Sequence, residues 1–98
     1  MYSRATKTTR VDLVGDKLIE SGESIIVSGI IIANEHTAVV SVDFDSGSGA
    51  LKFTVVCPPS SSVFTDFEFL ADGGLNIDGL VSNGDLVVVS VFHSAGGM

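Results

Sequence analysis

The segment "SIIVSGIIIAN" (residues 24–34) decides the fold class of this chain. It is rich in β-branched residues, which favour strands, and side chains in a strand point alternately to opposite faces. Alternation places on one face Ile25, Val27, Gly29, Ile31 and Ala33, and on the other Ser24, Ile26, Ser28, Ile30, Ile32 and Asn34. Antiparallel strands in small soluble proteins normally turn one polar face to water. Both faces here are largely apolar, so the question is what covers the second one.

The sequence after residue 22 keeps this two-residue apolar spacing. "TAVVSVDFD" (37–45) and "ALKFTVVC" (50–57) alternate apolar and polar residues on either side of the turn sequence "SGSG" (46–49). Glycine supplies the positive φ that tight turns need, so these segments predict a β-hairpin. Pro58 and Pro59 end its second strand, because proline has no N–H to donate to a neighbouring strand.

Further strands are expected toward the C-terminus, in "SSSVFTDFEFLA" (60–71), "LNI" (75–77) and "DLVVVSVFHS" (85–94). "DGG" (72–74) and "SNGD" (82–85) are typical of turns, and the Asn-Gly pair of the second favours a type I′ hairpin. The regular alternation of short strands and turns predicts an all-β fold. We expect a single β-sandwich or jelly-roll-like domain of seven or eight mostly antiparallel strands.

The predicted β-sandwich domain spans residues 23–98, and residues 1–22 are expected to form an extended N-terminal arm and an edge strand. "TKTTRV" (6–11) suits either an arm or an edge strand. "DLVGDKLIES" (12–21) suits a short strand pair or one helical turn.

The composition describes a chain rich in apolar surface and short of charge. Its 98 residues are 45% hydrophobic and 17% charged, whereas globular proteins have about 25% charged residues. The single cysteine, Cys57, cannot form an intrachain disulfide, and two histidines with one cysteine fall short of a structural zinc site. No apolar run fits a secretory signal or a membrane helix. We expect a soluble protein made in a cytoplasm, without membrane association.

The net charge of −7 is unevenly distributed along the chain. Residues 1–17 hold four basic and two acidic residues, a net of +2, and the rest holds Lys52 against ten carboxylates, a net of −9. An acidic body repels phosphate, so nucleic-acid binding is disfavoured. The basic start is either a frayed terminus or an arm that docks on an acidic neighbour. Arg4, Lys7 and Arg10 would supply the docking contacts.

Two of the expected strands, 24–34 and 85–94, are apolar on both faces, and no helix is expected to cover them. The second faces could fill a barrel interior, lie under loops or meet a neighbouring chain. We favour the third arrangement, a homo-oligomer. The predicted interface consists of Ile26, Ile30, Ile32, Val87, Val89 and Val91.

Residues able to carry chemistry are few. Asp43 with Asp45, and Asp66 with Glu68, share strand faces and could hold a cation, but the spaced oxygen ligands of a calcium loop are absent. His36, His93 and the many serines lack a nucleophile elbow, and Cys57 is expected to point inward as packing. The sequence therefore predicts neither catalytic residues nor a metal or cofactor site. A hydrolase that uses either histidine is the weakest of the alternatives.

The order of the segments resembles that of small β-sandwich virion proteins of tailed bacteriophages, of the capsid decoration (cement), head-fibre and tail-module kinds. An apolar strand ends near an Asn, an alternating strand runs into an Asp-to-Gly turn, and the next strand leaves through Pro. A Gly-Leu strand and a valine-rich strand complete the pattern over residues 23–93. The matching positions are Asn34, Asp45, Gly47, Gly49, Pro58, Gly74 and Leu75. The second proline, Pro59, and the longer basic N-terminal arm depart from it.

This resemblance implies a non-enzymatic structural protein of the virion, assembled in the host cytoplasm and forming a homotrimer. It would be a decoration protein that binds and stabilises the lattice of the major capsid protein. The basic arm would then be removable without loss of the fold. The alternative is a tail or head-fibre module that binds a host-surface receptor or another tail protein.

Overall fold

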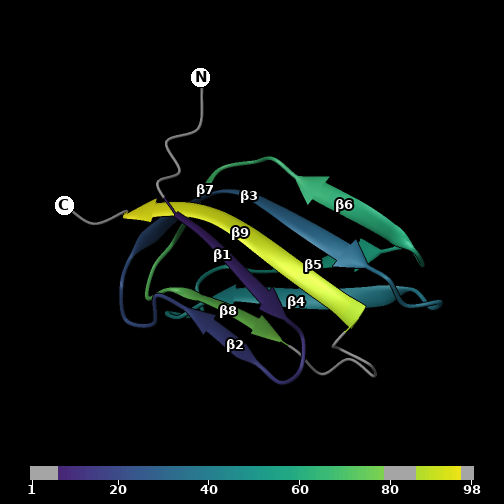
Figure 1. The fold of residues 1–98 in the computed structure, drawn as a ribbon. Coiled ribbons are helices and arrows are strands. Elements are labelled where there is room, and N and C mark those ends of the chain that lie inside the picture. The colour runs from purple at the N-terminus through teal and green to yellow at the C-terminus, as the bar shows by residue number, and fades with distance from the viewer. Residues whose placement is uncertain (1–6, 79–85, 96–98) are drawn as a thin grey trace.

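The computed structural model describes residues 7–78 and 86–95, and every regular element within them is a β-strand (Figure 1). The strands are β1 (Lys7–Asp12), β2 (Lys17–Ile19), β3 (Ile25–Asn34), β4 (Val40–Ser46), β5 (Lys52–Cys57), β6 (Ser61–Thr65), β7 (Phe69–Ala71), β8 (Leu75–Asp78) and β9 (Val87–Ala95). They form two antiparallel sheets that pack together, so the fold is the predicted β-sandwich. The Asn-Gly turn expected at 82–85 lies outside the described residues.

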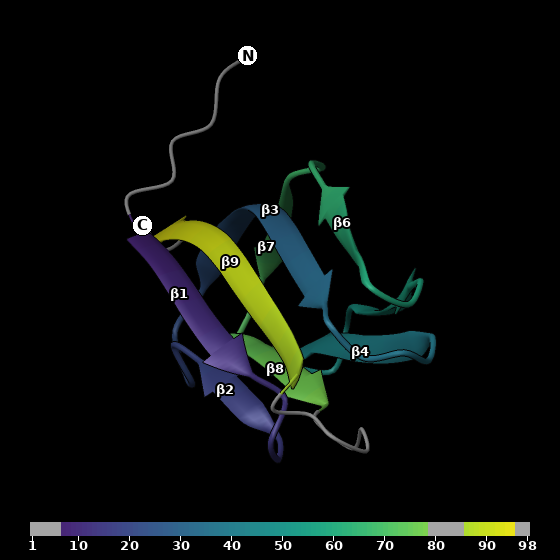
Figure 2. The ribbon, with the colours of Figure 1, turned by 45° about the vertical axis from the view of Figure 1, so that its right-hand side comes forward.

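One sheet has five strands and the other has four. The five-stranded sheet has the order β1-β9-β3-β6, and β7 also pairs with β3, on Ile25–Val27, while β6 pairs with Ile30–Asn34. The four-stranded sheet has the order β2-β8-β4-β5. Figure 2 shows the two layers, with β1 and β6 at opposite edges of the larger sheet.

The N-terminal region contributes a strand to each sheet. β1 pairs with β9 along its whole length, and β2 pairs with β8. Leu13 and Ile19 are buried in the core between the sheets. Residues 7–22 are thus part of the sandwich, and only residues 1–6, which lie outside the described range, remain for the predicted arm.

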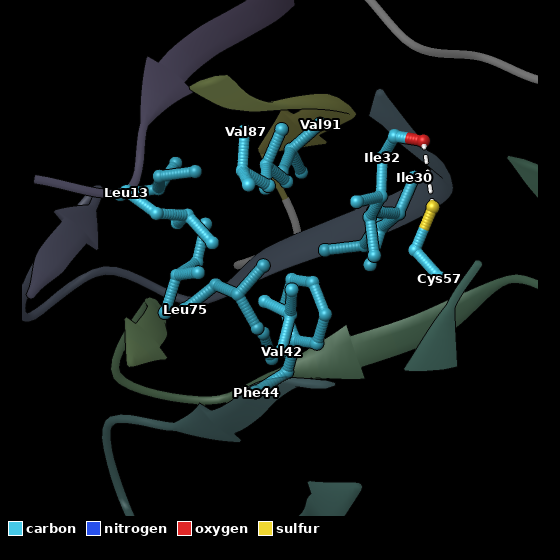
Figure 3. Packing of buried hydrophobic residues seen from close by; sticks show 14 of the residues in the cluster. Leu13, Ile30, Ile32, Val42, Phe44, Cys57, Leu75, Val87 and Val91 are labelled. Atoms are coloured by element: carbon cyan, nitrogen blue, oxygen red, sulfur yellow. Dashed lines mark hydrogen bonds between the residues drawn. The ribbon is translucent and has the colours of Figure 1, made fainter. Parts of the chain in front are cut away.

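The hydrophobic core lies between the two sheets. Figure 3 shows Val42 and Phe44 of the four-stranded sheet on one side, and Val87 and Val91 of the five-stranded sheet on the other. Phe44 stacks on the ring of Phe53, with centroids 5.1 Å apart. β-Branched and aromatic side chains from both inner faces fill this space, and the core takes up about half of the Val, Ile and Leu of the sequence.

A β-bulge in β3 answers the question raised by its two apolar faces. Val27 lies opposite His93 of β9, but Gly29 lies opposite the adjacent Phe92, so Ser28 is an extra residue. A bulge of one residue exchanges the two faces of the strand beyond it. Accordingly the odd-numbered Ile25 and Val27 are buried before the bulge, and the even-numbered residues Ile30, Ile32 and Asn34 after it.

The predicted oligomer interface is therefore largely wrong. Ile30, Ile32, Val87, Val89 and Val91 are each 0–1% exposed within their own chain and cannot face a neighbour. β3 reverses its faces at the bulge, and β9 simply alternates, with its odd-numbered valines inward. Of the six predicted interface residues, Ile26 alone lies outside the core.

The segment 60–71, expected as one strand, is broken into β6 and β7 at residues 66–68. The break lies beside the bulge of β3, which keeps both irregularities at one level of the sheet. It also explains why the described residues contain nine strands where seven or eight are expected.

The hairpin predicted around "SGSG" is present, since β4 pairs with β5. Its turn is fixed to the 72–74 turn by backbone hydrogen bonds from Gly47 to Gly74 and from Ser48 to Asp72, each 2.9 Å long. A Cβ on Gly47 would fall on the carbonyl of Gly73, so this close approach of two turns requires glycine.

The bulge predicts that truncation of two neighbouring isoleucines lowers the free energy of unfolding by different amounts. Ile32→Ala removes a fully buried side chain and should lower the free energy of unfolding by about 2–5 kcal/mol. Ile31→Ala removes a half-buried side chain from the outer face and should cost less than half as much. Urea denaturation followed by circular dichroism measures both values. Unbroken alternation from Ile25 would reverse the order, and that result would contradict the bulge.

Candidate functional site

The outer surface of the five-stranded sheet carries a set of neighbouring apolar side chains, which we call the apolar face. They are the outward residues of β3, β6, β7 and β9, opposite in direction to the core residues of the same strands. The apolar face consists of Ile26, Ile31, Ala33, Phe64, Leu70, Val88 and Phe92.

The strand register brings these residues side by side. Ile31 lies opposite Phe64 on one neighbouring strand, and Ile26 lies opposite Leu70. Phe64 is 60% exposed and Leu70 54% exposed. The ring of Phe64 lies over Gly29, because a Cβ added there would be 3.1 Å from its Cε1 atom. The absence of a side chain at the bulge thus lets this aromatic ring lie across the sheet.

Charged residues border the apolar face at its two edges. On the β1 edge, Arg10 is exposed and lies in register with Ser90, which in turn lies opposite Ile31. On the β6–β7 edge, Asp66 and Glu68 are exposed in the break between the two strands. The β1 edge also carries the exposed Asp12, in register with Val88 and paired with Lys17 at 3.4 Å. Arg10 leaves this edge with a net positive charge, whereas the β6–β7 edge is acidic.

The outer surface of the four-stranded sheet is largely polar, apart from the exposed Leu18 and Val56, and we call it the acidic face. Asp43 and Asp78 lie opposite each other on β4 and β8, and Lys52 lies opposite Asp45. These residues line an open hollow of about 420 Å³. Asp43 Oδ1 accepts a hydrogen bond of 2.6 Å from the Thr54 hydroxyl. Within residues 7–78 and 86–95, no group of three His, Cys, Asp or Glu residues is placed to hold a metal ion.

His93 occupies a buried corner between β1 and β9, next to a cavity of about 140 Å³. Its Nε2 atom is 2.8 Å from Thr9 Oγ1 in a hydrogen bond. Burial lowers the pKa of His93 below its ordinary value of 6.5; nearby Glu20 opposes this change and Lys7 adds to it. Lys7 and Glu20 form an ion pair of 3.0 Å over the same corner. This histidine therefore holds an edge strand in place as a neutral ring.

Cys57 and His36 have structural surroundings. Cys57 is buried, and its thiol lies 3.4 Å from the carbonyl oxygen of Ser61. Burial raises its pKa, which disfavours the reactive thiolate. The buried Asn34 side chain donates to the carbonyls of Ala38 and Pro58 and accepts from the N–H of His36. His36 is thus part of a turn joined to the end of β5.

The three residues predicted for the docking arm do not form one free segment. Arg4 lies outside the described residues. Lys7 and Arg10 belong to β1, a strand of the sandwich rather than a free arm. Lys7 is paired with Glu20, and Arg10 lies at the border of the apolar face.

Sequence reasoning missed most of the apolar face. It placed Ile31 on the wrong side of β3, since strict alternation groups it with the buried Ile25 and Val27. The signal that could have found the bulge is Gly29, because an isolated glycine within a strand pattern often marks one. Phe64 and Leu70 share the even-numbered face of the segment 60–71 with Asp66 and Glu68, a pattern that does not by itself indicate a larger surface.

Fold and site together define a small β-sandwich with one apolar and one acidic outer face. No family model matches the chain, and neither a curated protein nor a solved structure matches it. Among the residues that the structure describes, no helix is long and apolar enough to span a membrane.

The buried corner predicts a pH dependence of stability. Because the pKa of His93 is lower in the folded chain, the unfolded chain binds a proton more readily. Stability should be complete above about pH 6.5 and should fall as the pH decreases below that value. Urea denaturation between pH 7.5 and 5 tests this, since most carboxylates remain ionised there.

The control for this experiment is His93→Gln, which removes the titrating ring. Its stability should be lower at pH 7.5 but should change less than that of the wild type between pH 6.5 and 5. An unaltered slope in this variant would assign the pH dependence to another group.

Proposed function

We propose that this chain is a non-enzymatic structural protein of a tailed-phage virion, a capsid decoration protein that binds the major capsid lattice as an oligomer. The observation that carries the proposal is the apolar face. It provides a surface for association into an oligomer, and the segment order resembles that of virion β-sandwich proteins.

The apolar face gives a physical reason for association. Phe64 and Leu70 are more than half exposed, and covering such side chains gains about 1 kcal/mol or more each. Exposed apolar patches of this extent in small soluble proteins commonly mark interaction sites. A contact repeated over a regular lattice gains further from multivalency, so that each individual contact can be weak.

The two histidines and the single cysteine hold the fold together. His93 bonds Thr9 under an ion pair, His36 belongs to the Asn34 turn, and Cys57 is buried with a raised pKa. The acidic face has carboxylates without a metal-binding cluster among the described residues. Binding through a surface explains these features better than catalysis does.

The burial of five predicted interface residues changes the reason for oligomerisation but leaves a surface that can support it. The excess of Val and Ile is accommodated inside one chain, so the apolar content alone no longer demands a partner. It is the exposed apolar residues on the outer side of the same sheet that favour association. In the proposed attachment to capsid, Arg4 within residues 1–6 is the remaining candidate from the basic arm.

Co-sedimentation with purified capsids of the phage that encodes the chain tests the proposal. The full chain should sediment with capsids and raise their melting temperature. Isolated tails and whole host cells serve as the other two binding partners. Binding to tails or cells, with none to capsids, would favour the tail or head-fibre module, and binding to none of the three would overturn the proposal.

A deletion tests the arm separately. It should stop at residue 6, because β1 pairs with β9 from Lys7 onward and a deletion of residues 1–10 would remove the Thr9–His93 bond. Removal of residues 1–6 should weaken capsid binding and leave the melting temperature of the free protein unchanged. Unchanged capsid binding would exclude a docking role for Arg4.

A further inference from the structure

We propose that the occupant of the apolar face is a second copy of this chain, packed sheet to sheet about a two-fold axis that runs parallel to the strands. The inference deepens the proposed function by naming the partner that covers this face. It is tested on the purified protein, independently of any capsid.

The charges at the two edges favour this orientation. A two-fold axis in the plane of contact and parallel to the strands places the β1 edge of one copy over the β6–β7 edge of the other. Arg10 then meets the edge that carries Asp66 and Glu68. An axis perpendicular to the strands would instead place each edge over its own copy, so that the carboxylates of Asp66 and Glu68 would meet those of the second copy.

The register makes the expected contact more specific. Rotation about an axis parallel to the strands keeps each residue at its level along the sheet. Arg10, Ser90, Ile31 and Phe64 lie at one level across the sheet. The guanidinium of Arg10 therefore lies over the exposed ring of Phe64 of the second copy, a cation–π arrangement, with Asp66 two residues along. The same contact occurs twice in the dimer, as two-fold symmetry requires.

The size of the face suits a dimer of modest affinity. The strands of this sheet have six residues in β1, nine in β9, ten in β3, five in β6 and three in β7. At about 3.3 Å along and about 4.8 Å across per residue they cover roughly 500 Å². Two such surfaces bury roughly 1,000 Å², which is about the minimum for a biological interface. Two copies packed in this way resemble the aligned sheets of a sandwich.

The overall charge favours contact through the apolar face over contact through the acidic face. Each chain carries a net charge of −7, so two copies repel each other in most orientations. The acidic face with Asp43, Asp45 and Asp78 lies across the sandwich from the apolar face. Contact through the apolar face thus keeps these carboxylates far apart. The contact is also closed, because each copy uses its one apolar face for the other.

Sedimentation equilibrium of the purified chain over 1–200 µM measures the association. The wild type should approach twice the chain mass, and Phe64→Glu should remain at the mass of one chain. Val56→Glu is the matched control, because Val56 is 55% exposed on the outer side of the other sheet. It should associate like the wild type. Leu70→Glu replaces Phe64→Glu if circular dichroism shows that the latter is unfolded.

A charge exchange tests the orientation. Arg10→Glu should raise the dimer dissociation constant about tenfold, and the double variant Arg10→Glu with Asp66→Arg should restore it to within about threefold. Neither residue belongs to the core, so a general loss of stability would not be repaired by the second change.

Any of the following results would overturn the inference. One is a wild type of single-chain mass at 200 µM. Another is a mass of three chains, which a two-fold contact does not allow. The third is a dimer that Phe64→Glu leaves intact, or one that the charge exchange fails to restore. A monomer that still binds capsids would leave the proposed function standing, and a dimer that binds none would leave this inference standing.

Discussion

The extra residue in β3, Ser28, is the feature on which the arrangement of both faces depends. Without it, the strand would bury Ile25, Val27 and Ile31 on one side and direct Ile30 and Ile32 to water. With it, the strand contributes its apolar residues to the core along its whole length, against β9, which has no such irregularity. The break between β6 and β7 at the same level lets the neighbouring edge follow the bend, and the absent side chain of Gly29 makes room for Phe64.

The fold class could be predicted from the sequence because its signals are local. Two-residue spacing, glycine turns and the Pro58–Pro59 stop each concern a few adjacent residues, and the hairpin of β4 and β5 follows from them directly. The faces of β3 could not be assigned in the same way, because a bulge is defined by the partner strand. Likewise β1 belongs to the sandwich through its pairing with the distant β9, which no feature of "TKTTRV" alone reveals.

The same distinction explains what sequence reasoning could say about the site. Excess apolar content predicts a partner, but a two-layer sandwich has space between its sheets for all of Ile30, Ile32, Val87, Val89 and Val91. What the structure leaves exposed are residues such as Phe64 and Leu70, which look like ordinary strand residues in the sequence. They form one surface only because β6 and β7 both pair with β3.

The two outer faces of the sandwich differ in chemistry, so they favour different contacts. Covering the apolar face lowers the free energy, because its side chains are removed from water. Bringing a second acidic chain to the acidic face raises the free energy through charge repulsion. Arg10 on one edge, and Asp66 with Glu68 on the other, make the apolar face complementary to itself when the edges are exchanged. In such a pair the two acidic faces point outward, so a dimer would present to a lattice a surface chemically distinct from the one that holds it together. Assembly and attachment can then be separate properties of a single chain of 98 residues.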